Sequence, residues 1–312
     1  MITVSQKIKV AVSHLLRTQM EMDVEDYGLK GMGDLCNRIL ANYAEFPEAN
    51  ILASDDVFYK TVPPLQFSLN RTGESYASYA NNNSVPTAAL CRHYFECYVN
   101  LPRAKRECFI FAESLNKLKK AIRSRVNVNL LYRGESKNVS PCFLAFSPSQ
   151  VRAYIVVCDN DTSKQPLERY HSFRLCHIKG VALDAKSQAF HCESFELSRQ
   201  AETFREHFDP FLCYGKQVTV RLSDKGVERF NRLTTNRPKI IGRTNTVGAQ
   251  SVDIETIEKI DIPGDYVFEC SEKLAKVYFP QFLGEAEILE PRNLRLWFKD
   301  QLENAAKVYS GR

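Results

Sequence analysis

The sequence lacks the long apolar runs and the leader features that direct a chain to or across a membrane. Its longest apolar stretches, such as residues 154–158, are far shorter than the roughly 20 residues that a membrane-spanning helix needs. The first residues show neither an apolar core segment nor a small-residue cleavage site of the kind a secretory signal has. We therefore expect no membrane association and a cytoplasmic location.

The sequence also has little of what familiar active sites are built from. It contains only six histidines in 312 residues. It has no Gly-x-Ser-x-Gly elbow, no phosphate-binding loop and no dinucleotide-binding fingerprint. These absences predict a non-enzymatic protein, with no catalytic residue and no cofactor.

The ten cysteines include no Cys-x-x-Cys pair. The densest cluster is Cys91, His93 and Cys97, which falls in an expected helix, where Cys91 and His93 would point about 200° apart. A zinc site needs ligands that converge on one point. We therefore expect no metal site and interpret most cysteines as small core residues.

The charge is distributed unevenly along the chain. Residues 101–137 carry ten Lys or Arg against three acids, and residues 216–246 carry eight against two. Between residues 251 and 290 the balance reverses to ten acids against three bases. Two basic stretches and one acidic stretch suit a polyanionic partner better than a neutral metabolite.

An internal repeat occupies residues 1–102. Residues 35–47 align without gaps with residues 90–102, and Leu, Cys, Tyr and Pro match outright. Upstream of each copy lies a segment in which apolar residues alternate with others, around Val10 in the first copy and Phe67 in the second. A period of two predicts a strand with one buried and one open face. With Ser13 and Gly28 suited to the start and end of an intervening helix, each copy predicts strand, helix, helix.

This order resembles the ribbon-helix-helix family of nucleic-acid-binding proteins. The resemblance implies that two copies pair their strands into an antiparallel ribbon that enters the major groove of DNA. Side chains on the open face of such a ribbon can bind base edges or phosphates, and here they are Lys7, Lys9, Gln66, Ser68 and Asn70. The copies could pair within one chain or between two chains, and they could serve dimerisation alone.

Residues 103–125 predict a helical linker, because its apolar residues recur at helical spacing. From residue 126 onward the period changes to that of strands. Five short strands with brief polar turns predict a small barrel; they span residues 126–132, 139–146, 152–158, 170–175 and 178–182.

Residues 126–190 resemble a WYL domain, a five-stranded Sm-like β-barrel common in bacterial regulators. The resemblance rests on four ordered pieces, Leu131-Tyr132-Arg133-Gly134, Val139-Ser140-Pro141, Ala153-Tyr154-Ile155 and Phe173-Arg174-Leu175-Cys176-His177-Ile178. The sequence departs from the family pattern where Ala153 replaces the tryptophan, Cys176 the aspartate and His177 the second arginine.

In that family the motif positions build a polar, basic pocket that senses a ligand, with nucleic-acid strands among the candidates. Aromatic rings interleaved with cations favour single strands, because bases stack on the rings and phosphates pair with the charges. The resemblance places six residues on this surface: Tyr132, Arg133, Tyr154, His171, Arg174 and His177. Core packing is the rival interpretation for Tyr154, and a structural salt bridge is the rival for Arg174.

Residues 191–312 predict a further α/β region, with strands at 217–222 and 266–270 and a final helix that reaches residue 309. The region resembles the extension that often follows WYL domains, which implies a ferredoxin-like α/β fold. Its recognisable part is the Leu-Glu-Pro-x-x-Leu-Arg turn at residues 289–295. Arg292 and Arg295 in this turn are candidate ligand contacts, with surface salt bridges as the alternative.

The sequence thus predicts an α+β protein that regulates through nucleic acid. Ribbon units combined with a WYL domain resemble the WYL accessory proteins found beside the RNA-targeting effectors of type VI-D CRISPR systems, which implies single-stranded RNA binding and a CRISPR effector as partner. The alternative is a DNA-binding transcriptional regulator whose WYL domain senses a nucleic-acid or nucleotide ligand. A scaffold that uses protein contacts alone is a third interpretation. We expect a homodimer, because ribbon units and exposed barrel edges favour two-fold association.

Overall fold

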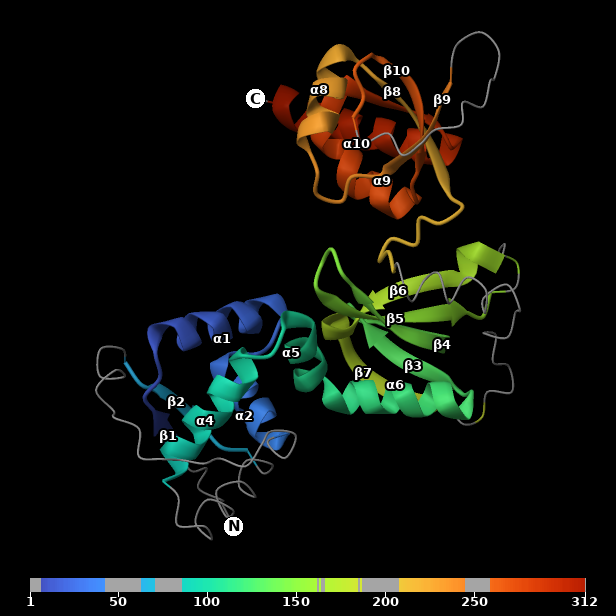
Figure 1. The fold of residues 1–312 in the computed structure, drawn as a ribbon. Helices are drawn as coiled ribbons and strands as arrows, with labels where there is room; N and C mark the ends of the chain where they lie inside the picture. Colours follow the sequence, from blue (N-terminus) through green and yellow to red (C-terminus); the bar gives the residue numbers. More distant parts are fainter. Residues whose placement is uncertain are drawn as a thin grey trace. The chain divides into compact units, whose positions relative to one another are not determined.

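The computed structural model describes residues 7–42, 63–70, 86–161, 163, 166–184, 186, 208–244 and 259–311. In these residues the fold is mixed α+β, with helices and antiparallel sheets (Figure 1). The chain divides into two compact units, Met1–Phe208 and Asp209–Arg312, and each has its own hydrophobic core. Across the described residues, no helix combines the length and the apolar character that crossing a bilayer demands.

Strands β1 (Lys7–Val10) and β2 (Leu65–Ser68) pair antiparallel within one chain. Their burial alternates as the sequence predicted, with Ile8 and Val10 buried opposite Phe67 and Leu65. The residues that alternate with these along each strand, Lys7 and Lys9 in β1 and Gln66 and Ser68 in β2, are exposed. Because the ribbon forms inside one chain, pairing between chains is not needed to complete it, which removes one of the two reasons for expecting a homodimer.

Helices α1 (His14–Asp26), α2 (Met32–Ala41) and α4 (Thr87–Val99) pack beside this ribbon (Figure 1). As predicted, Ser13 caps α1, and its hydroxyl accepts a hydrogen bond from the Leu16 N–H at 3.2 Å. Gly28 follows the helix with a φ of 57°, a left-handed conformation that suits glycine. The first helix expected in the second copy of the repeat lies outside the described residues.

The two copies of the repeat hold each other's strands. Asn37 in α2 and Arg92 in α4 occupy equivalent repeat positions. Asn37 Nδ2 donates to the Ser68 carbonyl at 3.0 Å, and Arg92 Nε donates to the Ala11 carbonyl at 2.7 Å. Ser68 and Ala11 are themselves equivalent, since each directly precedes the last apolar residue of its alternating segment. Each helix therefore fastens the strand of the other copy.

A five-stranded antiparallel sheet follows, with the strands within a few residues of their predicted places. Its strands are β3 (Asn127–Tyr132), β4 (Glu135–Ser147), β5 (Arg152–Asp159), β6 (Tyr170–Arg174) and β7 (Ile178–Asp184), in the order β6-β5-β4-β3-β7. Short 3-10 turns precede and follow β6, η3 (Pro166–Arg169) and η4 (Leu175–His177).

The expectation of a barrel needs correction, because the sheet is open across the described residues. Strands β6 and β7 lie at its two edges and pair with β5 and β3 respectively. The three-residue turn η4 joins them end to end. A connection this short turns the chain from one edge to the other without laying the strands side by side, so no ladder forms between them.

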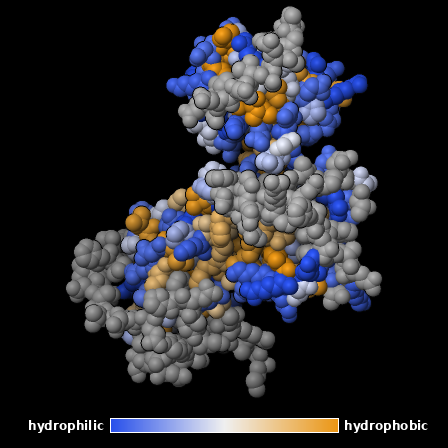
Figure 2. Space-filling view, turned by 45° about the vertical axis from the view of Figure 1, so that its right-hand side comes forward, coloured by the Kyte–Doolittle hydropathy of each residue, from blue (hydrophilic) through white to orange (hydrophobic). Residues whose placement is uncertain are grey.

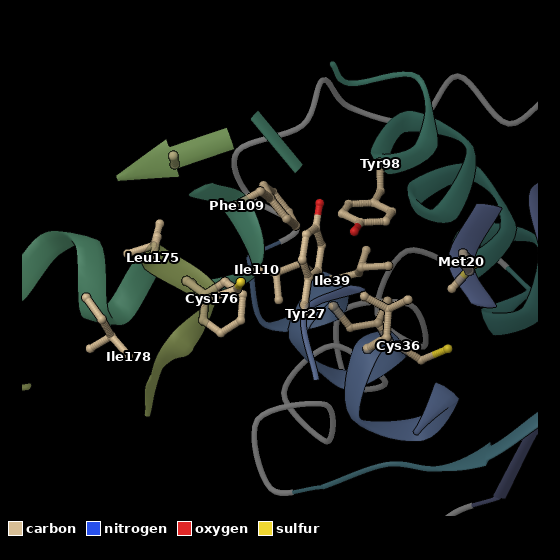
Figure 3. Packing of buried hydrophobic residues seen from close by; sticks show 14 of the residues in the cluster. Met20, Tyr27, Cys36, Ile39, Tyr98, Phe109, Ile110, Leu175, Cys176 and Ile178 are labelled. Carbon is tan, nitrogen blue, oxygen red and sulfur yellow. The ribbon is translucent and has the colours of Figure 1, made fainter. Parts of the chain in front are cut away.

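Helices α5 (Arg103–Ile110) and α6 (Ala112–Ser124) connect the ribbon region to the sheet. Both helices pack on strands of the sheet, α5 on β5 and α6 on β4 and β7. Figure 3 shows Tyr27, which follows α1, and Ile110 of α5 lying towards Cys176, which belongs to η4 between two strands of the sheet. One hydrophobic core therefore runs from the ribbon helices into the sheet.

The second unit contains a four-stranded antiparallel sheet with the order β11-β8-β10-β9. Its elements are β8 (Gln217–Leu222), α8 (Asp224–Arg232), β9 (Lys239–Thr244), β10 (Gly264–Glu269), α9 (Glu272–Tyr278), η5 (Phe279–Glu285), β11 (Ala286–Glu290) and α10 (Arg292–Ser310). Strand β9 was not predicted. Buried rings fill the core, among them Phe230 and Phe268 with centroids 5.5 Å apart. On the faces seen in Figure 2, both units show hydrophobic patches flanked by hydrophilic side chains.

Candidate nucleic-acid interface

A row of rings joins the end of β3 to β6 and η4. Tyr132 stacks on Phe173 with centroids 4.2 Å apart and planes 21° apart. Phe173 is followed by His171, 6.1 Å away and nearly parallel, and the edge of His177 meets Tyr132 at 6.1 Å. We call these four residues the ring row. The Phe173 ring is buried, whereas Tyr132, His171 and His177 are each half-buried and so remain partly accessible.

Arg133 lies over the end of this row. Its guanidinium carbon is 5.7 Å from the centre of the Tyr132 ring, and its Nε lies 3.4 Å from His177 Nδ1. Arg133 is exposed and has a φ of 50°, in the turn that leads to Gly134. The turn thereby places a cation directly against two rings.

His177 is held neutral by its surroundings. Burial, together with the cations Arg133, Arg174 and Lys179, lowers the pKa of His177 to about 4. A neutral imidazole can accept the hydrogen bond from Arg133 through Nδ1. The ring therefore supports the arginine at neutral pH and leaves the positive charge on Arg133.

His171 at the other end of the row is oriented by a carboxylate. Its Nε2 lies 3.0 Å from Asp159 Oδ2, and its side chain is 40% exposed. Arg169 donates to the Asp159 carbonyl at 3.0 Å. The row thus has a histidine at each end, His171 beside Asp159 and His177 beside Arg133, with Tyr132 and Phe173 between them.

Tyr154 pairs in register with Arg174, the residue that follows Phe173 of the ring row. It is buried, its ring packs 5.5 Å from Phe208, and its hydroxyl donates to Gln150 Oε1. Burial raises the pKa of Tyr154 to about 12. The structure thus gives this residue the packing contacts of the rival interpretation, and a role in strand binding stays a prediction.

Arg174 is engaged by acids from the helices. Its Nη2 lies 3.2 Å from Asp26 Oδ1, and its Nε lies 3.7 Å from Glu107 Oε1. Asp26 also pairs with Arg103 at 2.7 Å and with Arg152. We call Arg103, Arg152 and Arg174 the arginine cluster. The sequence reasoning had not singled out Asp26 or Arg152.

Glu107 fastens the sheet to α5. Its side chain is wholly buried and accepts hydrogen bonds from the Ala153 N–H at 3.0 Å and the Cys176 N–H at 3.1 Å. Burial raises the pKa of Glu107, against the opposing effect of these bonds and of Arg174. One carboxylate thus joins the start of β5 to η4. Its place beside the apolar run 108–111 was the available sequence signal.

The predicted ribbon residues share one exposed face. Lys7 pairs in register with Ser68, and Lys9 with Gln66, and all four are exposed. Asn70 lies just beyond β2, where its backbone N–H donates to Asn37 Oδ1 at 3.0 Å. The ribbon therefore presents two cations and two neutral polar side chains on neighbouring strands.

The two predicted arginines of the second unit lie at the start of α10. Arg295 Nη2 donates to Glu287 Oε1 at 2.5 Å. Arg292 is exposed. The salt bridge of Arg295 is the structural alternative that the sequence left open, and a role for either residue in ligand binding stays a prediction.

The histidine and cysteines of α4 do not form a metal site among the described residues, where no cluster of three candidate ligands occurs. Cys97 Sγ lies 3.5 Å from His93 Nε2, one helical turn away. Cys91 is buried in the core. Two side chains at this spacing leave a metal ion without the four ligands that structural zinc needs.

The ribbon, the open sheet with its ring row and the α/β unit together define a composite α+β protein. No protein-family model and no curated protein matches the chain. Among solved structures, one described as a CRISPR Cas-related protein matches 99% of this chain and 95% of its own, with 15% identity and a TM-score of 0.60. The likeness to CRISPR-associated proteins that the sequence indicated is thus present in the fold. Proteasome accessory factor B/C of Arthrobacter aurescens aligns over 99% of this chain and 51% of its own, at 12% identity and with a TM-score of only 0.30.

Proposed function

We propose that this protein is a non-enzymatic, nucleic-acid-binding regulator, and that it acts as an RNA-binding accessory protein of an RNA-targeting type VI CRISPR effector. The ring row with Arg133 is the observation that carries the proposal. The fold shared with a CRISPR Cas-related protein supports the choice of partner.

The geometry of the ring row favours a single strand. Bases stack on aromatic side chains at about 1 to 3 kcal/mol each, whatever their identity. The bases of a duplex are already stacked and paired, so their faces are closed to a protein ring. Arg133, beside Tyr132, can bind a phosphate while the neighbouring base contacts the row.

The finer architecture that we propose agrees with the packing. Two half-ribbons whose helices fasten each other's strands are what a ribbon-helix-helix pair requires, here within one chain. The open sheet around the ring row would be an Sm-like sheet of WYL type. In the second unit, the strand order β11-β8-β10-β9 with helices after β8 and β10 supports a ferredoxin-like extension.

A second candidate function rests on the ribbon. Lys7, Lys9 and Gln66 share one exposed face, and such side chains can bind phosphates and base edges in a major groove. This favours a DNA-binding transcriptional regulator that uses the sheet as a ligand sensor.

Competition binding tests both candidates. Labelled single-stranded RNA would be competed with unlabelled single-stranded RNA, single-stranded DNA and duplex DNA at two salt concentrations. The accessory function predicts that single strands compete best and that affinity falls steeply with salt, since phosphate contacts release counterions. Preference for one duplex sequence would favour the regulator, and salt-independent or absent binding, or chemical turnover of the strand, would overturn both.

A further inference from the structure

The arginine cluster offers more hydrogen-bond donors than its acids can accept. Arg152 Nη1 and Arg174 Nε are buried and have no hydrogen-bond partner among the described residues. Arg152 is only 4% exposed. The two oxygens of Asp26 already serve three guanidinium groups, Oδ1 facing Arg174 and Oδ2 facing Arg103 and Arg152. A buried donor without an acceptor is costly, so this surplus indicates a richer acceptor than a carboxylate.

The position of Asp26 serves the cluster and not its own helix. Asp26 is the last residue of α1, and an acid there opposes the negative end of the helix dipole. The carbonyls at this end are bound instead by cations from the sheet, with Lys179 Nζ 3.1 Å from the Gly28 carbonyl. The Asp26 carboxylate therefore fastens the end of α1 to the sheet.

We propose that the Asp26 carboxylate holds the place of a phosphate group in the arginine cluster, so that a bound nucleic-acid strand and the end of α1 compete for the same guanidinium groups. A phosphodiester carries one negative charge, as Asp26 does, so the exchange leaves the charge of the cluster unchanged. It supplies oxygens in the geometry that pairs with arginine. This inference rests on the proposed function, because it names the regulation of strand binding.

Arg103 of the cluster can be reached from solvent beside α1. A hollow of about 570 Å³ lies there, and its lining consists of Gln19, Met22, Asp23, Glu25, Asp26, Arg103 and Arg106. Arg103, the most exposed member of the cluster, is 45% exposed. Arg152 and Arg174 do not line this hollow, so a phosphate would meet Arg103 first and reach the other two arginines only by displacing Asp26.

Displacement of Asp26 would be transmitted to the ribbon. Only residues 11–13 separate β1 from α1, and α1 packs on α2 and α4, which hold the two ribbon strands. Strand binding at the cluster would loosen the last turn of α1. This gives the sheet a physical means to change what the ribbon presents.

Asp26→Asn tests the competition, with Glu21→Gln as its matched control. Glu21 lies in the same helix and pairs with Arg17, so its replacement removes the same charge away from the hollow and the arginine cluster. Binding of a fluorescent single-stranded oligouridylate would be measured by anisotropy. We expect Asp26→Asn to bind about tenfold more tightly than wild type, because the strand no longer displaces an internal competitor. Glu21→Gln should stay within about twofold.

Hydrogen exchange on the wild-type protein gives a second readout that does not depend on how the variant folds. Saturation with the oligouridylate should speed amide exchange in the last turn of α1. Equal affinities of Asp26→Asn and Glu21→Gln, or unchanged exchange in α1 at saturation, would overturn the inference while leaving strand binding intact. Failure of both wild type and Asp26→Asn to bind the strand would overturn the proposed function together with it.

Discussion

Arg133 and Arg174 come from the same set of motifs but have opposite surroundings. Arg133 follows β3 in a left-handed turn and lies on the surface against Tyr132. Arg174 ends β6 and lies beneath Asp26 and Glu107. The first arginine can bind a strand at once, whereas the second must first lose a partner. A motif therefore places cations near one another, and the helices that pack on the sheet decide which of them are available.

The largest effect should come from the buried partners of Arg174. Glu107→Ala removes the acceptor of two buried N–H groups and a partner of Arg174, and we expect the free energy of unfolding to fall by about 3 kcal/mol. Urea denaturation would measure it. Glu113→Ala, which removes a carboxylate exposed on α6, should change stability by less than about 0.5 kcal/mol. Similar losses for both would mean that Glu107 does not fasten the sheet.

At the exposed surface around Arg133, the expected effect is on strand binding. Tyr132→Ala removes the middle of the ring row, and we expect single-stranded RNA to bind with about 1 to 3 kcal/mol less free energy. Anisotropy titrations would measure it, with folding checked by circular dichroism. Tyr309→Ala is the control, because Tyr309 is an exposed tyrosine of the second unit. Equal affinities for Tyr132→Ala and wild type would remove the ring row from the interface.

Both arginines act on His177, whose protonation makes the stability of the protein depend on pH. The pKa of His177 is lowered from 6.5 to about 4, so below pH 6.5 the unfolded chain binds a proton that the folded protein does not. Stability should therefore fall as the pH drops from about 6.5 towards 4, by roughly 1 kcal/mol from this residue, since the ring is partly open to water. Denaturation across this range should show a shallower decline for His177→Asn. Parallel curves would contradict the assignment.

The smallest effect is expected on the ribbon, which contains neither of the two arginines. Lys9→Ala removes one exposed cation, and we expect duplex DNA affinity to fall about threefold, with the salt dependence reduced by about one counterion. Lys120→Ala on the exposed face of α6 controls for overall charge. If Lys9→Ala weakened binding of single-stranded RNA more than Tyr132→Ala does, the main interface would be the ribbon.

The sequence predicted those parts of the fold that leave a local periodic signal. Alternation at Ile8 and Val10 located β1, and the repeat at residues 35–47 and 90–102 located α2 and α4. The Ser13 cap and Gly28 marked the ends of α1. Strand β9 was missed, because charged, polar and glycine residues interrupt its apolar pattern.

The polar cluster left no such signal, because its members are far apart in the chain. Asp26 and Arg174 are separated by 148 residues, and Asp23 and Arg106, another buried ion pair, by 83. No periodicity connects residues at these distances, so only the packed helices bring them together. The same contact is the salt bridge that the sequence left open as the rival interpretation for Arg174. The motif could not decide between the two, because it describes the sheet and not the helix end that covers it.

The single-chain ribbon has a consequence for how the protein behaves on dilution. A ribbon built from two chains dissociates into separate subunits when the protein concentration falls below the dissociation constant. Here Asn37 and Arg92 fasten two strands that one polypeptide keeps together, so the ribbon persists however dilute the chain is. A substitution in β1 then changes one strand of the ribbon and leaves β2 unchanged. The two strands can therefore evolve different binding properties.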